Sequence, residues 1–274
     1  MTDPNSSCLA PYGCFQELMD AQLADLQQRF GMALWMVVRR RGDDHILLHV
    51  HDSYYGLQQG QKLDWQHSPC SLVETQGRAQ LANNADGLPP HLTGMPVGAF
   101  LSLPLMDQHQ CFFGTLCALH PTAYDGDLED HRQALLHQAR LLSFMLGNAL
   151  TDLSHQRITA FIDQPHRCQQ TGLLDATGWQ ETLEEERQRC RDFGLYATVI
   201  ELQGPEQAHT LTLADSLAAL LREEDSIGHL GNNRFAILLA ETSPERAQAV
   251  LLRIRDALNA KRLLVAVKLN TLSA

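Results

Sequence analysis

The chain has 274 residues, of which 44% are apolar, and a formal net charge of −11. This length suits two domains of ordinary size, and the apolar fraction is enough for each to bury a core. The acidic balance argues against a nucleic-acid or anionic-membrane surface, because both partners are themselves negatively charged. No run of about 18 apolar residues occurs, so we expect no transmembrane helix.

The N-terminal stretch, residues 1–13, and the cysteines indicate a cytoplasmic protein. The stretch is polar and lacks the basic and then apolar regions of a signal peptide. The seven cysteines are scattered and form no CxxC pair, so reduced thiols are the simplest interpretation. Cys70 and Cys117 are interpreted as buried structural residues in preference to redox-active ones.

The first half of the chain alternates helical and strand patterns. A long segment at 52–98 is rich in Gly, Pro, Asn and His, which predicts an insertion folded over one face of a sheet. The polar turn at 41–44 joins two apolar runs and predicts an antiparallel hairpin. In order, the predicted elements are a helix at 15–30 and strands at 33–38, 45–50, 99–106 and 111–119.

Residues 15–155 resemble a GAF domain, a small-molecule sensor module with a central antiparallel sheet and flanking helices. The likeness rests on residues 68–74 (SPCSLVE), on 100–105, and most of all on 113–119 (FGTLCAL). The resemblance implies a ligand between the sheet and the crossing segment at 52–98. It does not name that ligand, because one fold hosts many functions.

Histidines in this half raise the alternative of a metal or haem site. His45, His49 and His51 fall on one face of a predicted strand, and His67 and Cys70 could add to them. No acidic or thiolate partner sits at metal-ligand spacing, so solvent-facing or hydrogen-bonded core histidines are the favoured interpretation. We therefore predict no metal site.

Residues 127–155 predict a long connecting helix, because they lack proline and contain one glycine, Gly147. Apolar residues alternate along it at steps of four and three, at Leu135, Ala139, Leu142, Leu146, Ala149 and Leu153. This heptad stripe predicts a homodimer through paired helices; packing on the helix's own sheet is the alternative, and each half could do one. Residues 156–170, with Pro165 and few apolar residues, predict a linker.

The stretch 222–239, REEDSIGHLGNNRFAILL, predicts a β-hairpin. Gly231, Asn232 and Asn233 tolerate the positive φ of a tight turn, and an apolar run suited to a buried strand follows at 237–239. Further elements are predicted as a helix at 179–193, a strand at 196–202, a helix at 244–258 and a strand at 263–269.

This hairpin is similar to the turn of diguanylate cyclase (GGDEF) domains, and residues 171–175 (TGLLD) resemble the start of such a domain. Arg222, Asp225, Gly231 and Phe235 stand at the family's spacing. The resemblance implies that residues 171–274 form a trimmed α/β sandwich of βαβ type. The predicted fold class is therefore α/β (α+β), with a GAF domain at 15–155, a linker at 156–170 and a GGDEF-like domain at 171–274.

The chain departs from that family at the positions that carry its chemistry. Arg234 replaces an acid that helps bind Mg²⁺, which needs anionic oxygen ligands, and arginine cannot deprotonate. Glu201 occupies the position of a metal-binding Asp, but Gln203 replaces the second acid. Between Gln203 and Leu211, roughly ten residues of the nucleotide-binding segment are missing, and catalysis requires a positioned substrate.

We therefore predict a non-enzymatic signalling protein that senses a small molecule or partner and relays the state to a protein partner. The alternative is a cyclic di-GMP receptor, because Arg222 and Asp225 match the family's inhibitory Arg-x-x-Asp site and suit phosphate and guanine groups. A solvated turn explains the same residues. A residual diguanylate cyclase is the third hypothesis. No cofactor is expected beyond cyclic di-GMP or an unidentified GAF ligand.

Overall fold

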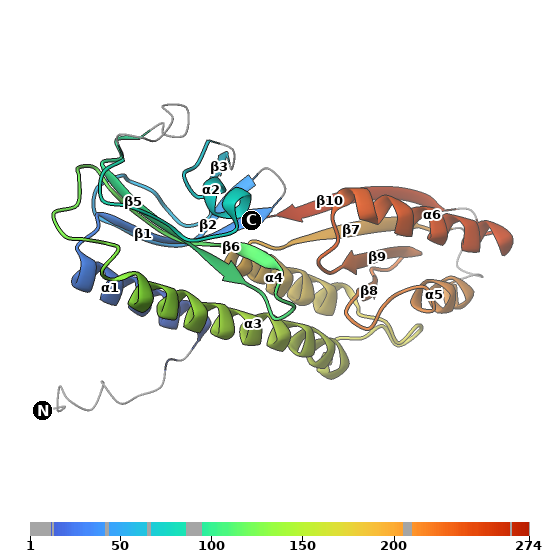
Figure 1. Ribbon diagram of the computed structural model, residues 1–274. Helices are drawn as coiled ribbons and strands as arrows, with labels where there is room; N and C mark the ends of the chain where they lie inside the picture. The colour runs from blue at the N-terminus through green and yellow to red at the C-terminus, as the bar shows by residue number, and fades with distance from the viewer. Residues whose placement is uncertain are drawn as a thin grey trace, which may run out of the picture. The chain divides into compact units, whose positions relative to one another are not determined.

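The computed structural model describes residues 12, 14–41, 44–64, 67–85, 95–204, 210–263 and 265–273. The chain divides into two compact units, Met1–Thr151 and Asp152–Ala274. Figure 1 shows that each unit has its own sheet with helices packed on it. Among the described helices, none has the length and apolar character needed to cross a membrane.

The first unit is built on a six-stranded antiparallel sheet in the order β3-β2-β1-β6-β5-β4. Both predicted hairpins are confirmed, as β1–β2 and β5–β6, and the insertion between them contributes two short edge strands and a helix. The strands are β1 Leu34–Arg41, β2 Asp44–Asp52, β3 Lys62–Asp64, β4 Gln80–Ala82, β5 Ala99–Met106 and β6 Phe112–His120, and the helix is α2 Ser71–Gln76.

Helices α1 (Phe15–Phe30) and α3 (Arg132–Asp163) run along one face of this sheet, and α2 lies on the other (Figure 1). The apolar spacing of α1 brings four side chains onto the sheet, Met19, Leu23, Leu26 and Phe30. The helix ends at Gly31, whose φ of 64° is readily adopted by glycine. The predicted helix at 15–30 is thus confirmed.

The connecting helix α3 differs from its prediction in three respects. It begins at Arg132 instead of residue 127. It ends at Asp163 instead of residue 155, so about half of the predicted linker is helical. Its apolar stripe is buried within the single chain at Leu135, Ala139, Leu142, Leu146 and Leu153. The stripe therefore packs internally, as the alternative interpretation held, and it is not free to form a seam between two helices.

The FGTLCAL stretch forms the centre of the sheet and explains its glycine. A Cβ at Gly114 would lie 1.9 Å from the Val38 carbonyl oxygen, so a larger residue would force the two strands apart. Cys117 of β6 forms a disulfide with Cys70 on the crossing segment. This pair corrects the expectation that all seven cysteines are reduced, and it arises because the two side chains face each other in the core.

The strand histidines lie at different depths. His45 and His49 are buried in the core, whereas His51 is partly exposed. Among the described residues, no group of three or more His, Cys, Asp or Glu side chains is arranged to hold a metal ion.

The second unit has a four-stranded sheet in the order β10-β7-β9-β8. All neighbouring strand pairs are antiparallel. The βαβ prediction is nevertheless confirmed, because β7 and β8 both run antiparallel to β9, and β9 and β10 both run antiparallel to β7. The helices at 210–218 and 244–260 therefore each connect two parallel strands that have a third strand between them. The strands are β7 Tyr196–Gln203, β8 Ser226–His229, β9 Arg234–Leu239 and β10 Ala266–Ser273, and the helices are α4 Ala176–Phe193, α5 Thr210–Ala218 and α6 Pro244–Ala260.

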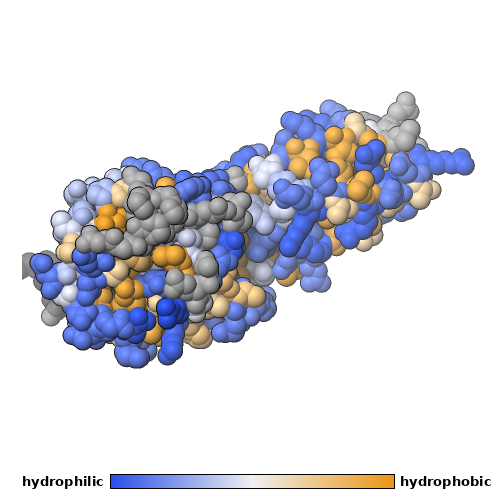
Figure 2. Space-filling model, turned by 45° about the horizontal axis from the view of Figure 1, so that its top comes forward, coloured by the Kyte–Doolittle hydropathy of each residue, from blue (hydrophilic) through white to orange (hydrophobic). Residues whose placement is uncertain are grey.

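Alternation along these strands divides the second core between the two faces of the sheet. Ile200, Leu202, Phe235 and Ile237 pack with apolar residues of α5 and α6, and α4 contacts β7, β8 and β10. Figure 2 shows that apolar patches interrupt a mainly hydrophilic surface on both units. The exposed large apolar residues among those described are Tyr12, Tyr54, Leu141, Phe144, Ile162, Leu211 and Leu252.

Candidate functional site

The turn between β8 and β9 adopts the conformation that its sequence predicts. Gly231, Asn232 and Asn233 have φ values of 83°, 50° and 55°. Glycine and asparagine are the residues that adopt this left-handed region most readily. The predicted hairpin turn and its left-handed backbone conformation are therefore confirmed.

The same turn is anchored within its own unit. The Asn232 carbonyl accepts a hydrogen bond from Gln203 Nε2 at 3.0 Å, and the Asn233 carbonyl accepts one from Gly204 N at 2.8 Å. The buried Asn233 side chain accepts a hydrogen bond from the hydroxyl of Thr210. These contacts tie the turn to β7 and to α5.

Arg234 and Lys268 flank the single carboxylate at the position expected for metal binding. Arg234 pairs in register with Gln203, and Lys268 pairs with Glu201, on opposite sides of β7. The four side chains line a cavity of about 240 Å³, and Glu201 accepts a hydrogen bond from Asn270 Nδ2 at 3.0 Å. Mg²⁺ prefers several anionic oxygen ligands, whereas the described lining of this cavity contains one carboxylate beside two cations.

Phe235 has a structural position. Its side chain is buried in the core of the second unit, and its ring stacks on His229 with centroids 4.7 Å apart. The match to the family signature at this position is thus explained by packing.

The structure brings Arg222 and Asp225 together in the loop between α5 and β8. Arg222 Nη2 lies 2.9 Å from Asp225 Oδ1, and Nε lies 3.2 Å from Oδ2, which is a bidentate pair. The Asp225 side chain is buried, whereas the Arg222 side chain is 55% exposed. The hydrogen bonds that Arg222 donates to the Asp225 carboxylate raise the pKa of Arg222 further, so the guanidinium remains charged.

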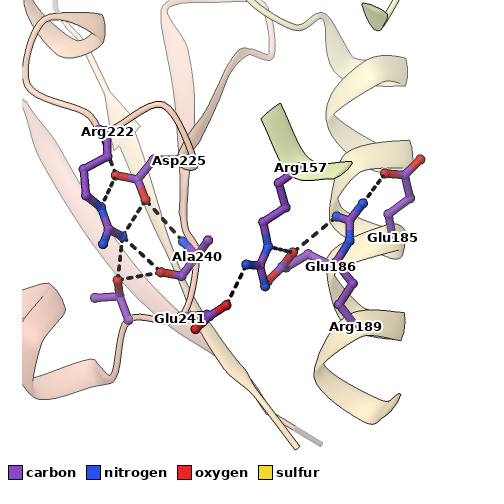
Figure 3. Close-up of polar contacts among 9 residues, drawn as sticks. Arg157, Glu185, Glu186, Arg189, Arg222, Asp225, Ala240 and Glu241 are labelled. Atoms are coloured by element: carbon purple, nitrogen blue, oxygen red, sulfur yellow. Dashed lines mark hydrogen bonds and ion pairs between the residues drawn. The ribbon is translucent and has the colours of Figure 1, made fainter. Parts of the chain in front are cut away.

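Arg222 also holds the turn that follows β9. Its Nη2 donates to the Ala240 carbonyl at 3.0 Å, as Figure 3 shows, and also to Thr242 Oγ1 at 3.1 Å. Glu241, between these two residues, has a φ of 50°. The guanidinium therefore stabilises a turn whose central residue is in an unfavourable backbone conformation.

A cavity of about 460 Å³ lies beside Arg222, within the second unit. Its lining combines apolar and charged side chains. Its lining includes Ile158, Phe161 and Ile162 from α3, Leu173, Leu221, Ile227, and the charged residues Arg167, Arg222, Glu223 and Asp225. Arg167 stacks over the Phe161 ring at 4.9 Å, so an aromatic face and two guanidinium groups border one space.

Arg157, which the sequence analysis did not identify, is the centre of a buried charge network. Its Nε and Nη2 each donate to Glu186 at 3.0 Å, and its Nη1 donates to Glu241 at 2.7 Å (Figure 3). The side chains of Arg157 and Glu186 are 4% and 1% exposed. One signal was available: Arg157 stands four residues after Leu153, so it continues the buried stripe of the helix.

The GAF domain family model matches residues 15–150. The first unit is a GAF domain. The chain is also 27% identical over 133 residues to the probable diguanylate cyclase DgcC of Escherichia coli strain K12, a match that covers 40% of this chain and 35% of that protein. The chain thus spans about a third of the length of this curated relative. The GAF domain is followed by a GGDEF-like domain.

Three solved structures illustrate the resemblance. Free methionine-R-sulfoxide reductase from Neisseria meningitidis has a TM-score of 0.44 at 17% identity and covers 53% of this chain and 86% of its own. The FimX GGDEF domain from Pseudomonas aeruginosa has a TM-score of 0.36 at 17% identity and covers 39% and 80%. PelD 158-CT from Pseudomonas aeruginosa PAO1 has a TM-score of 0.34 at 18% identity and covers 94% and 83%.

Proposed function

We propose that this protein is a signalling protein without diguanylate cyclase activity. Its GAF domain senses a small molecule or a partner, and its GGDEF-like domain passes the resulting state to a protein partner. One observation carries the proposal: Arg234 and Lys268 flank Glu201 where a cyclase would hold its metal.

The physical reason is electrostatic. Transfer of a nucleotidyl group requires a divalent cation to neutralise the triphosphate and to orient it. A permanently charged guanidinium beside the one carboxylate repels that cation, and Glu201 alone offers too few oxygen ligands. Nucleotide positioning is weakened as well, because the segment between Gln203 and Leu211 is roughly ten residues shorter than the family's nucleotide-binding segment.

The test is incubation of the purified protein with GTP and Mg²⁺, or with GTP and Mn²⁺. We expect no cyclic di-GMP and no pyrophosphate beyond what a Glu201→Ala variant releases, because neither protein binds the metal in a productive geometry. Product formed by the wild-type chain and lost in Glu201→Ala would show an active cyclase and overturn the proposal.

The Arg222 cavity favours a second function, reception of cyclic di-GMP. An exposed guanidinium can bind a phosphodiester through its fork, and Asp225 can accept hydrogen bonds from guanine N–H groups. Ile158, Phe161 and Ile162 give the same cavity an apolar lining that a purine could contact. These groups support a ligand that combines two negative charges with two flat bases.

Isothermal titration calorimetry with cyclic di-GMP tests this second function. Arg222→Ala should weaken binding at least tenfold, since it removes the charged fork. Arg234→Ala, which removes another exposed arginine of the same unit, is the matched control and should bind as wild type does. An absence of heat at millimolar ligand would exclude the receptor function.

For the GAF domain, we propose that the ligand site is the space between the sheet and the crossing segment. A cavity of about 210 Å³ lies there, with Met36, Leu63 and Met95 as apolar lining and His67 near Cys70. Its size suits a small molecule. Native mass spectrometry of the freshly purified protein would reveal a co-purified ligand as added mass, and a Met36→Trp variant, which fills the cavity, should lose that mass.

We also propose a homodimer through the outer face of α3. Phe144 is 68% exposed and lines a groove of about 650 Å³ together with Pro104 and Met106, and Leu141 on the same helix is also exposed. Exposed apolar residues beside a groove are typical of interaction surfaces. Sedimentation velocity should show a dimer that Phe144→Glu dissociates, whereas Leu211→Glu, at an exposed apolar residue on α5, leaves it intact. A wild-type monomer would contradict the proposal.

A further inference from the structure

The last two turns of α3 belong to the second unit, and one stripe of their side chains faces the rest of that unit. Arg157, Ile158, Phe161 and Ile162 are spaced by one, three and one residues, which places them on the same side of the helix. Arg157 is held by Glu186 and Glu241, and the other three line the Arg222 cavity. The cavity and the buried charge network therefore share one helix.

A second connection runs through the turn at 240–242. Arg222 donates to residues on both sides of Glu241, namely to the Ala240 carbonyl and to Thr242 Oγ1. Asp225 Oδ1 accepts a hydrogen bond from Ala240 N at 3.3 Å. The Arg-x-x-Asp pair thus helps to hold the turn that presents the Glu241 carboxylate to Arg157 (Figure 3).

A bound phosphate would compete for these same donors. Arg222 Nη2 carries two hydrogens, and it serves three acceptors: Asp225 Oδ1, the Ala240 carbonyl and Thr242 Oγ1. An ionised phosphate oxygen accepts a stronger hydrogen bond than a carbonyl or a hydroxyl does. A phosphodiester on Arg222 should therefore displace the two turn acceptors first.

We propose that occupancy of the Arg222 cavity is coupled to α3 through the 240–242 turn. Cyclic di-GMP, on taking the Arg222 guanidinium, releases the turn and weakens the Glu241–Arg157 contact, which leaves Glu186 as the remaining acceptor described for Arg157. This inference rests on the proposed receptor function. Because α3 begins in the GAF domain at Arg132 and ends in the second unit at Asp163, the released contact lies on the helix that joins sensor and output.

Coupling of this kind is reciprocal: if the ligand weakens the Glu241–Arg157 contact, loss of that contact strengthens ligand binding. The decisive variant is the double substitution Arg157→Gln with Glu186→Gln. It removes the contact but leaves the net charge unchanged, and it leaves no buried charge without its partner. We expect the double variant to bind cyclic di-GMP roughly fivefold more tightly than wild type, the lower end of typical coupling.

Calorimetry on the full chain gives the first readout, and hydrogen exchange gives the second. In the wild type, ligand should raise exchange in peptides covering residues 240–242, because Ala240 N loses its acceptor as Asp225 turns to the guanine. Glu241→Gln is the second variant, in case the double variant does not fold. The Glu241 side chain is 46% exposed, so we expect this substitution to leave the fold intact. In this variant, α3 peptides covering 157–162 should already exchange as they do in ligand-bound wild type.

The outcomes separate the two levels of the proposal. Wild-type affinity in the double variant, or unchanged or slowed exchange at 240–242 on binding, overturns the coupling and leaves the receptor function standing. No binding by the wild-type chain overturns both. Tighter binding by the double variant together with faster exchange of the turn supports the coupling.

Discussion

Arg157 illustrates how a buried charge is tolerated at the scale of a single residue. Burial lowers the pKa of Arg157, but the hydrogen bonds and charges of Glu186 and Glu241 outweigh that effect, and the pKa is raised. The guanidinium is therefore charged and depends on its carboxylates. Breaking such a pair from one side is costly, because the remaining partner is left uncompensated in the interior.

Arg157→Ala should destabilise the second unit by about 3–5 kcal/mol, since the buried Glu186 carboxylate loses its bidentate partner and keeps only the 3.3 Å hydrogen bond from Arg189. Arg191→Ala, which removes an exposed arginine paired with Glu184 on α4, should cost less than about 1 kcal/mol. Urea denaturation of both variants measures the difference. Equal effects would mean that the Arg157 pair has no special stabilising role.

His45 provides a pH prediction for the GAF domain. Burial lowers its pKa from 6.5 to about 4. In the unfolded chain His45 is protonated below its ordinary pKa, whereas in the folded chain it stays neutral down to about pH 4. The contribution of His45 to the free energy of unfolding is therefore complete above pH 6.5 and is lost as the pH falls toward 4. Between pH 7 and pH 5 the loss should be about 2 kcal/mol. Denaturation curves of His45→Gln should lack this loss; an identical pH profile would refute the assignment.

At the scale of elements, α3 shows what apolar periodicity specifies. The pattern identified the helix and its buried face, but an apolar stripe suits a sheet of the same chain as well as a second helix. The end of the helix was predicted too early, because few apolar residues follow residue 158. The last turns are held in the second unit by the contacts of the charged Arg157 with Glu186 and Glu241. The β8–β9 turn was predicted better, since positive φ is a local property of glycine and asparagine.

Two neighbouring leucines on α3 test this assignment of faces. Leu142→Ala should cost about 2–5 kcal/mol of unfolding free energy, because Leu142 is buried and its truncation leaves a cavity. Leu141→Ala, at an exposed position one residue earlier, should stay within about 0.5 kcal/mol at dilute concentration, where any dimer is dissociated. A larger effect at Leu141 would mean that the other face of α3 is the packed one.

At the scale of the whole molecule, the proposed sensing and output functions belong to two units with separate cores. A ligand that binds one folded unit stabilises that unit by mass action, by about 2.7 kcal/mol at a concentration one hundred times its dissociation constant. Cyclic di-GMP should therefore slow exchange in the core strands β7 and β9 and leave β1 and β6 unchanged. Native-state hydrogen exchange measures both in one experiment, and equal protection of the two sheets would place the ligand elsewhere.

The sequence was enough to predict the two domains, most helices and strands and the left-handed turn at 231–233, because residue spacing and backbone preference are properties of neighbouring residues. The antiparallel order of the second sheet, the Cys70–Cys117 pair, the closed Arg222–Asp225 fork and the Arg157 network depended on the tertiary structure. Each of these features joins residues that are distant in sequence, or depends on which of several possible partners a side chain contacts. Such pairing produces no repeating pattern in the sequence, so it could not be predicted from the sequence alone.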